Sequence, residues 1–388
     1  MIFYYTKNRN LAYNYNYIKL LMIFSIIFIL FITIKINLLI VFLKFKKKKI
    51  IFFYHPRKNL TLMHTYYIEY IFRNYSKEYY IIYGHEAESK INKNYIYIKQ
   101  GYLRFLFLID VFVSNNICDK FPNNCQKIYI HHNLYDDPWV PRNMEKEMCQ
   151  RLLKYNFIFV GTGDSVTRVN DMFVRYKFNF RPIIKEVGYA KLDYLLNHSK
   201  ENQKKKDSIL IAPTGIDGFP ELSIIAKIEK IIDNLLVETN FLIILRPHPR
   251  DRTNKKYLYL KEKYNNNDRF SFDISENYFH TYSRSKLMIT DMSGTAYTFA
   301  FLILSPVIFL STNEKKIGEN EYTNYSFYLD RNKIGKVIFD EKEILNTVRL
   351  IFKDYPLYEK NIFKIRSRMK YLNKSKIEIK NFIEKLNR

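Results

Sequence analysis

Short apolar runs alternate with amphipathic stretches along the chain from residue 50 onward. The runs are rich in Ile, Val, Phe and Tyr, which predicts buried strands, and apolar residues at helical spacing lie between several of them. In the first half the predicted strands are 50–54, 80–83, 95–98, 110–114, 127–131, 157–160 and 183–187, with helices at 60–75 and 144–155. This alternation is typical of a parallel sheet with helices on its faces.

A second alternating unit follows a polar segment. Residues 197–208 are almost wholly polar and predict a linker. Beyond it we expect strands at 208–212, 241–245, 286–290 and 307–310, and helices at 222–236, 257–264 and 295–303. The sequence therefore predicts an α/β fold with two Rossmann-like domains facing a cleft. Their expected bounds are 50–196 and 209–388, the second ending in a basic helical tail.

The N-terminal segment has a different pattern. Residues 20–43 are apolar apart from a few positions, among them Lys35 and Asn37, and 24 residues are enough to span about 30 Å as a helix. The cluster at 44–49 contains five lysines, which by the positive-inside rule places the later domains in the cytoplasm and would attract anionic lipids. We expect residues 1–49 to form an arm with a transmembrane or anchor helix, a helix lying in the membrane interface being the alternative.

Charge follows the same division. The chain of 388 residues has 63 Lys and Arg against 38 Asp and Glu, a net charge of +25, and eleven of the basic residues precede the first acidic one, Glu69. The basic excess is thus concentrated around the apolar segment, and no nucleic-acid-binding motif accompanies it, so nucleic acid is not an expected partner. The three cysteines have neither a disulfide-scaffold nor a zinc-site spacing.

Two loops that follow predicted strands carry phosphate-type chemistry. After strand 241–245 comes Arg246-Pro247-His248-Pro249-Arg250, in which two prolines stiffen a loop with two guanidiniums and one imidazole. After strand 286–290 comes Asp291-Met292-Ser293-Gly294-Thr295, which opens a helix and would expose N–H groups and hydroxyls to an anion. Both loops are expected to bind a ligand, although a rigid turn and ordinary helix capping are the plainer interpretations.

Three weaker signals lie elsewhere. Thr214, in the turn after strand 208–212, is a candidate contact to a nucleotide. His131 and His132 end strand 127–131, with Asp136 and Asp137 close behind, but no third ligand stands at a metal-site spacing, so no metal is predicted. The Gly-x-Gly at 161–163 lacks the third glycine of a dinucleotide fingerprint and predicts only a strand–turn–helix.

In this order the motifs resemble the CDP-glycerol glycerophosphotransferase family, enzymes that build teichoic-acid-like and capsular poly(glycerol phosphate) on a two-domain GT-B fold. The matching stretches are 187–193 (VGYAKLD), 209–214 (ILIAPT), 245–249 (LRPHP), 289–296 (ITDMSGTA) and 306–309 (PVIF). The family's His-Gly pair, whose His is taken as the catalytic base, corresponds to His132-Asn133, with Asn in place of Gly.

The resemblance implies that an acceptor hydroxyl attacks the distal phosphorus of CDP-glycerol or a related donor and releases CMP. His132 would accept the proton, and His248 with Arg246 would stabilise the phosphates. The other implied donor- and phosphate-binding residues are Asp291, Ser293, Gly294, Thr295, Thr214 and Gly188. The acceptor would be a lipid-linked polymer at the membrane, and neither metal nor cofactor is implied.

Other functions remain open at this stage. A GT-B glycosyltransferase for capsule or lipooligosaccharide would use the same phosphate loops with a nucleotide sugar, and an epimerase of the same fold would share them. A non-catalytic, membrane-bound polymer-binding protein is the alternative of another class, suggested by Asn133. Release of CMP rather than a nucleoside diphosphate would separate phospho-alcohol transfer from glycosyl transfer.

Overall fold

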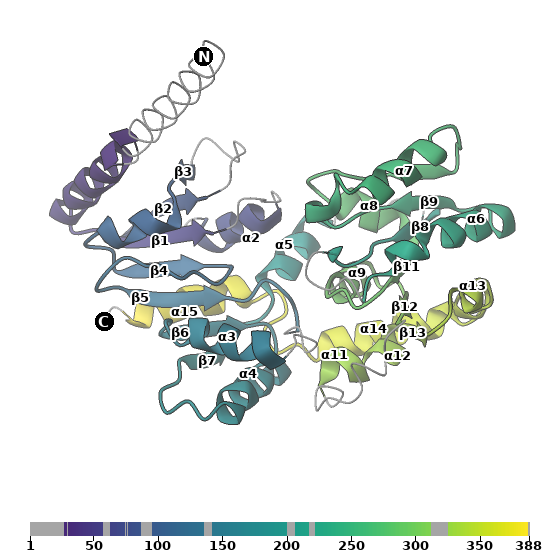
Figure 1. Ribbon diagram of the computed structural model, residues 1–388. Helices are drawn as coiled ribbons and strands as arrows, with labels where there is room; N and C mark the ends of the chain where they lie inside the picture. Colours follow the sequence, from purple (N-terminus) through teal and green to yellow (C-terminus); the bar gives the residue numbers. More distant parts are fainter. Residues whose placement is uncertain are drawn as a thin grey trace, which may run out of the picture. The chain divides into compact units, whose positions relative to one another are not determined.

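The computed structural model describes residues 27–28, 30–56, 63–73, 75, 77–86, 95–135, 142–199, 206–216, 222–311 and 325–386. Within these ranges the strands form two sheets with parallel pairing, and helices connect most of the successive strands (Figure 1). This arrangement confirms the predicted α/β class. The apolar runs are strands because both faces of each sheet are covered, which favours near-continuous apolar sequence over alternation.

The first sheet has the strand order β3-β2-β1-β4-β5-β6-β7. Its strands are β1 (Lys49–His55), β2 (Tyr79–His85), β3 (Tyr95–Tyr97), β4 (Val111–Ser114), β5 (Gln126–Ile130), β6 (Phe157–Val160) and β7 (Ile183–Glu186). Every strand predicted in this half is present, with ends that differ by no more than two residues.

The second sheet has the order β10-β9-β8-β11-β12-β13. Its strands are β8 (Ser208–Ile211), β9 (Leu242–Leu245), β10 (Phe270–Phe272), β11 (Ser285–Thr290), β12 (Val307–Leu310) and β13 (Gly335–Ile338). The two edge strands, β10 and β13, are not predicted from the sequence. In this sheet the strand order reverses between β8 and β11, and in open parallel sheets a ligand binds beyond the carboxyl ends of the strands at such a point.

Besides the helical residues 30–45, the α-helices of the described chain are α2 (Met63–Phe72), α3 (Arg142–Leu152), α4 (Gly163–Arg175), α5 (Ala190–Ser199), α6 (Ile228–Glu238), α7 (Lys255–Lys263), α8 (Phe279–Arg284), α9 (Thr295–Ile303), α11 (Ser326–Leu329), α12 (Arg331–Ile334), α13 (Ile344–Lys353), α14 (Tyr355–Ser367) and α15 (Ser375–Leu386). The predicted apolar stripe of α6 is buried in the core of the second sheet, where each such side chain contributes about 1.5–3 kcal/mol. The basic segment after Tyr355 forms the helices α14 and α15, and the start of α15 is held against α5 because Asp193 accepts the backbone N–H groups of Asn373 and Ser375.

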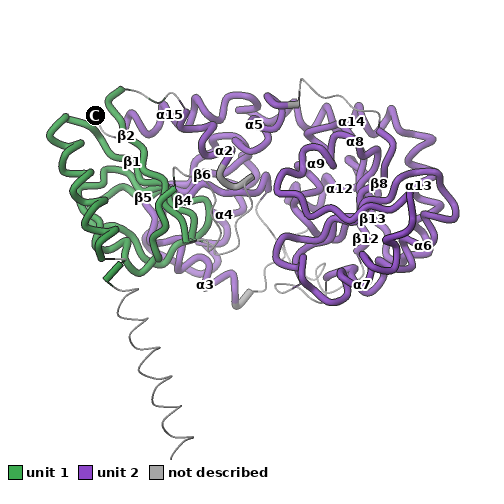
Figure 2. The backbone as a smooth tube through the Cα atoms, turned by 90° about the horizontal axis from the view of Figure 1, so that it is seen from above, with its two compact units in different colours: residues 1–58, 75–128 green, residues 59–74, 129–388 purple. Residues whose placement is uncertain are grey.

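The chain divides into two compact units (Figure 2). Unit 1 comprises Met1–Lys58 and Tyr75–Ile128, and unit 2 comprises Asn59–Asn74 and Tyr129–Arg388. This division does not follow the polar segment at 197–208, of which residues 200–205 lie outside the described ranges. The domain bounds given above therefore stay a prediction. Every residue that the sequence proposes for the site belongs to unit 2.

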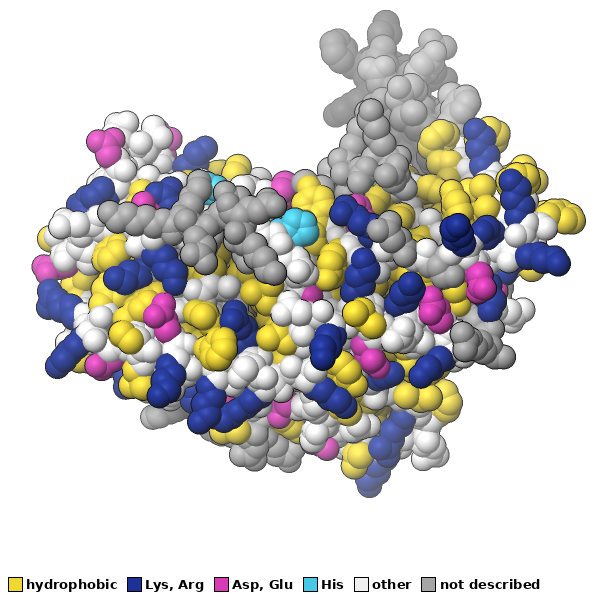
Figure 3. Space-filling model, turned by 180° about the vertical axis from the view of Figure 1, so that it is seen from behind, with side chains coloured by type: hydrophobic (Ala, Val, Ile, Leu, Met, Phe, Trp, Pro, Cys, Tyr) yellow, Lys and Arg dark blue, Asp and Glu magenta, His cyan; other side chains and the backbone are white. Residues whose placement is uncertain are grey.

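Part of the N-terminal segment packs against the rest of unit 1. Residues 30–45 are helical, Ile36 and Ile40 are buried, and the Asn37 amide donates to the carbonyl of Phe105 at 2.9 Å. Residues 20–26 and 29 of the predicted membrane segment lie outside the described ranges. Among the residues that are described, no helix combines the length and the apolar character needed to cross a bilayer. The opposite side of this helix is exposed and shows apolar side chains next to lysines, at the upper right of Figure 3.

Candidate functional site

Asp291 joins the carboxyl ends of β8 and β11. Its Oδ1 accepts the backbone N–H of Thr214 at 2.9 Å, and its Oδ2 accepts that of Ile224 at 3.4 Å. The side chain is fully buried, and burial raises the pKa of Asp291 to about 7, although the surrounding N–H groups act to lower it. Asp291 therefore fixes the loop that carries Thr214 at the point where the strand order reverses.

The loop after β9 brings His248 to the same edge of the sheet. A Cβ atom at Gly215 would lie 3.1 Å from His248 Nδ1 and 2.8 Å from a terminal nitrogen of Arg250, so only glycine leaves both side chains in place. His248 Nδ1 accepts the backbone N–H of Arg250 at 3.3 Å. A neutral imidazole that accepts through Nδ1 carries its proton on Nε2. His248 can therefore donate a hydrogen bond to a phosphate oxygen.

Arg246 is engaged within the protein. Its Nη1 is 2.5 Å from Asp273 Oδ2, and its Nη2 donates to the carbonyl of Ser275 at 2.8 Å. The side chain is only 8% exposed. Burial acts to raise the pKa of Asp273, but the Arg246 charge and local hydrogen bonds hold it below its usual value. Arg246 thus orders the segment after β10, and direct phosphate binding by its guanidinium stays a prediction.

Ser293, Gly294 and Thr295 form the start of α9. Gly294 occupies the N-cap position and no side chain caps this end of the helix, so the N–H groups of the first turn can bind an anion. The hydroxyl of Thr295 is hydrogen-bonded to that of Tyr282. Ser293 is partly exposed at the same edge. Of the two hydroxyls, Ser293 is therefore the better placed to contact a ligand.

His132 lies just beyond the end of β5. The hydroxyl of Tyr189 donates to the carbonyl oxygen of His132 at 3.1 Å and is 3.2 Å from the hydroxyl of Thr298 on α9. The Tyr189 hydroxyl thus links the end of β5, which carries His132, to α9. The neighbouring His131 is turned differently, with Nδ1 3.2 Å from the carbonyl of Asn133.

Gly188 faces the C-terminal segment. Its φ angle is +84°, and a Cβ atom there would lie 2.8 Å from Cβ and from the carbonyl oxygen of Tyr371. Both the left-handed backbone and the close approach require glycine at this position. The structure therefore explains Gly188 by packing, and the predicted donor contact has no support from these neighbours.

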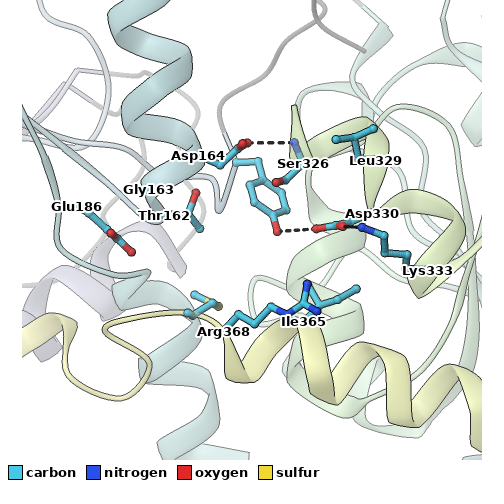
Figure 4. A pocket seen from close by; sticks show the side chains of 12 residues that line it. Thr162, Gly163, Asp164, Glu186, Ser326, Leu329, Asp330, Lys333, Ile365 and Arg368 are labelled. Carbon is cyan, nitrogen blue, oxygen red and sulfur yellow. Dashed lines mark hydrogen bonds and ion pairs between the residues drawn. The ribbon is translucent and has the colours of Figure 1, made fainter. Parts of the chain in front are cut away.

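A polar cavity of about 280 Å³ lies beyond β6 and β7 (Figure 4). Its lining residues are Tyr135, Thr162, Gly163, Asp164, Glu186, Ser326, Leu329, Asp330, Lys333, Ile365, Arg368 and Met369. Asp164 accepts the N–H of Ser326 at 3.0 Å, and Asp330 accepts from the Tyr135 hydroxyl at 3.2 Å. Burial raises the pKa of both Asp164 and Glu186.

None of the predicted site residues lines this cavity. Three carboxylates oppose an anion there, while Lys333, 2.7 Å from Asp330, and Arg368 keep the lining of mixed charge. Carboxylates accept hydrogen bonds from hydroxyl groups, and Leu329 and Ile365 offer apolar contact. The cavity therefore suits an uncharged, hydroxyl-rich ligand better than a phosphate.

The described residues contain no group of three or more His, Cys, Asp or Glu side chains arranged to hold a metal ion. Asp136 and Asp137, which follow the histidine pair in the sequence, lie outside the described ranges.

Two side chains beside Arg246, those of Lys191 and Tyr278, are not among the site residues predicted from the sequence. The side chains of Lys191 and Arg246 both lie over the ring of Tyr278. In the sequence, only the motif match at 187–193 includes Lys191.

The fold is shared with solved structures of low sequence identity. The wall teichoic acid polymerase TagF superposes with a TM-score of 0.61 at 18% identity, covering 87% of this chain and 88% of TagF. A TagF variant soaked with CDPG gives 0.60 at 19% identity over the same shares of the two chains. The UDP co-structure of S. aureus MnaA gives 0.56 at 14% identity, over 81% of this chain and 90% of MnaA.

No protein-family model and no curated protein matches the chain. At these identities the likeness shows the fold alone. It confirms the predicted GT-B-like fold with two Rossmann-like sheets.

Proposed function

We propose that this protein is a membrane-associated transferase that moves glycerol phosphate, or a similar alcohol phosphate, from a CDP-linked donor to an acceptor hydroxyl, releasing CMP. The observation that carries the proposal is the edge of the second sheet, where the Thr214–Gly215 turn packs on His248 and Arg250. TagF, which shares the fold, has been solved with CDPG. The motif matches supply the same assignment from the sequence.

Binding of the donor diphosphate is assigned to three groups at this edge. His248 donates from Nε2, Arg250 contributes a guanidinium, and the first turn of α9 contributes backbone N–H groups. All three are positioned before the ligand arrives, so they stabilise charge on the phosphates without reorganisation. The phosphate contacts need neither a metal nor a cofactor.

The chemical step is an in-line displacement at the glycerol-bearing phosphorus. The acceptor oxygen forms a new P–O bond, the bond from that phosphorus to the bridging oxygen breaks, and CMP leaves with the bonding electrons. His132 accepts the acceptor's proton. His248 hydrogen-bonds the departing CMP. Tyr189 holds the carbonyl of His132 and so orients the end of β5.

The polar cavity is assigned to the acceptor. Its carboxylates and the Tyr135 hydroxyl can bind a polyol chain through several hydroxyls at once. Tyr135 follows His132 by only three residues, so the cavity and the proposed base belong to the same strand end. The uncharged terminal polyol unit of a lipid-linked acceptor would occupy the cavity, while the phosphates of the polymer would lie outside it.

Membrane association is assigned to the exposed face of the N-terminal helix. Phe31, Ile34 and Leu38 are between 50% and 64% exposed, and Phe105 and Phe107 of the adjoining loop are nearly half exposed. The lysines at 46 and 47 are exposed at the end of the same helix. An apolar face with a basic flank matches an anionic lipid surface, which supports binding to a membrane. We assign this membrane to the cell membrane, with the catalytic residues on its cytoplasmic side.

A glycosyltransferase or epimerase acting on a nucleotide sugar is the second candidate. The specific observation in its favour is that the same fold occurs in the UDP co-structure of MnaA. The phosphate-binding edge would serve either donor, because both kinds of donor carry a diphosphate.

The test is nucleotide release from a panel of donors in detergent. The panel contains CDP-glycerol, CDP-alditols and UDP- and CDP-sugars, each with and without a lipid-linked glycerol phosphate acceptor. We expect acceptor-dependent CMP release that His248→Ala abolishes and that His280→Ala, at an exposed histidine of α8, leaves intact. Release of UDP or CDP instead would overturn the proposal and support the glycosyltransferase.

A further inference from the structure

Lys191 and Arg246 lie on the ring of one tyrosine. The Lys191 Nζ is 5.3 Å from the ring centroid of Tyr278, and the guanidinium carbon of Arg246 is 5.6 Å from it. Lys191 is in the first turn of α5, Arg246 follows β9, and Tyr278 precedes α8. Three segments distant in sequence thus bring two cations to a single aromatic side chain within unit 2.

The two cations are compensated differently. Arg246 is paired with Asp273 at 2.5 Å. Lys191 forms no ion pair or hydrogen bond with any residue that the structure describes, and its main electrostatic neighbour is the like charge of Arg246. Burial, followed by repulsion from Arg246, lowers the pKa of Lys191 to about 8. Within the described ranges, the Lys191 ammonium therefore has no anionic partner.

Tyr278 shows the complementary deficit. Its side chain is 8% exposed, and its hydroxyl is buried without a hydrogen-bond partner among the described residues. A buried hydroxyl that bonds to nothing loses its hydration without replacement. The Tyr278 hydroxyl could donate a hydrogen bond to an acceptor oxygen of a ligand, and the Lys191 ammonium lies over the same ring.

We propose that Lys191 and Tyr278 form a phosphate-binding subsite of the transferase, in which the ammonium and the phenol bind oxygens of one phosphate group. The inference rests on the proposed function and deepens it by adding a subsite next to the loop of His248. A phosphate satisfies both deficits, because it brings negative charge and several acceptor oxygens. The phosphate belongs either to the donor or to the polyol phosphate acceptor, and binding data separate the two.

The experiment is calorimetric titration of the full chain in detergent with CDP-glycerol, CMP, UDP, cytidine and inorganic phosphate. The variants are Lys191→Met, which keeps an apolar stem of similar length, Lys191→Arg and Tyr278→Phe. Lys255→Met, at an exposed lysine of α7, is the matched control. Acceptor KM is measured in parallel with a lipid-linked glycerol phosphate chain.

We expect Lys191→Met to weaken binding of a phosphate-bearing ligand by about tenfold to a hundredfold, as for the loss of a charge-assisted hydrogen bond. Tyr278→Phe should weaken binding of the phosphate-bearing ligand less than Lys191→Met does. Lys191→Arg should retain most of the affinity, and cytidine should bind all variants equally. Weaker CDP-glycerol binding identifies the donor phosphate. Unchanged donor binding with a raised acceptor KM identifies the acceptor phosphate.

Two results would overturn the subsite. One is that Lys191→Met matches Lys255→Met in donor affinity and in acceptor KM. The other is that cytidine binding falls together with that of the nucleotides, which would indicate general damage to the site. If the chain instead uses a UDP-sugar, the donor panel fails while the same variants still weaken UDP binding, so failure of the function and failure of the subsite are distinguishable.

Discussion

The carboxylate of Asp291 accepts the backbone N–H of Thr214 at 2.9 Å, across the point where the strand order of the second sheet reverses. This bond joins two loops that the sequence marks separately as candidate ligand contacts. The two loops have different roles. Asp291 is fully buried, while the turn at Thr214 and Gly215 packs against His248. The ligand edge therefore depends on the buried carboxylate of Asp291 for its position, and direct contact of Asp291 with a phosphate stays a prediction.

Replacing Asp291 by Asn should destabilise the protein and alter its pH dependence. An Asn amide can accept only one of the two N–H groups, so the loss should be about 1–3 kcal/mol. Burial raises the pKa of Asp291 from 3.8 to about 7, so the unfolded chain loses this proton before the folded one does. The contribution of Asp291 to the free energy of unfolding should thus fall as the pH rises from about 4 to 7. Urea unfolding of both proteins across this range measures it, and an identical slope in the variant would contradict the assignment.

Gly215→Ala tests the contact between the turn and His248. The added methyl group would meet the flexible end of Arg250 at 2.8 Å and the His248 ring at 3.1 Å, so both side chains should shift while the fold persists. We expect CMP affinity to fall about tenfold, equivalent to about 1.4 kcal/mol, with little change in melting temperature. Gly101→Ala, where a Cβ atom meets nothing within 4 Å, is the control. Equal affinity in the two variants would refute the contact.

Gly188→Ala should act on stability. The positive φ angle and the approach of Tyr371 together should cost at least about 1–3 kcal/mol. Because Gly188 faces the C-terminal segment, nucleotide affinity per folded molecule should not change. Chemical unfolding and calorimetry give the two quantities. A variant of normal stability with weakened nucleotide binding would instead support the donor contact that the sequence predicts for Gly188.

Polar substitutions on the N-terminal helix should weaken membrane binding. Phe31 and Leu38 are 50% and 64% exposed, so changing both to Ser should leave folding intact and reduce sedimentation with anionic vesicles about tenfold or more. Val237→Ser, at an apolar side chain of α6 that is 81% exposed, is the control. Unchanged sedimentation of the double variant would exclude this face as the lipid contact.

Much of the fold could be predicted because each strand is a compact apolar run. The two strands that escaped, β10 and β13, are edge strands, and their sequences, Phe-Ser-Phe and Gly-Lys-Val-Ile, are too short or too polar to stand out. Edge strands are covered on fewer sides, so burial constrains their sequence less. The N-terminal segment has a strong apolar signal that allows more than one interpretation. An apolar run of this length predicts a membrane helix equally well whether or not residues such as Ile36 and Ile40 are buried against protein.

The site was predictable where a motif follows a strand and not where a contact crosses between segments. Asp291 follows β11 directly and His248 is the third residue after β9, so strand topology alone brings them to one edge. The engagement of Arg246 by Asp273 and the approach of Lys191 to Tyr278 depend on tertiary packing. Local sequence carries no signal for such pairs.

The most direct test of the central claim is ³¹P NMR of the reaction between CDP-glycerol and a lipid-linked glycerol phosphate acceptor. The proposed displacement predicts loss of the diphosphate signals with equal gain of CMP and of a phosphodiester. The product should require acceptor and should be absent with His248→Ala. Formation of CDP with no new phosphodiester would contradict the account, because the bond broken would then lie on the glycerol side of the distal phosphate.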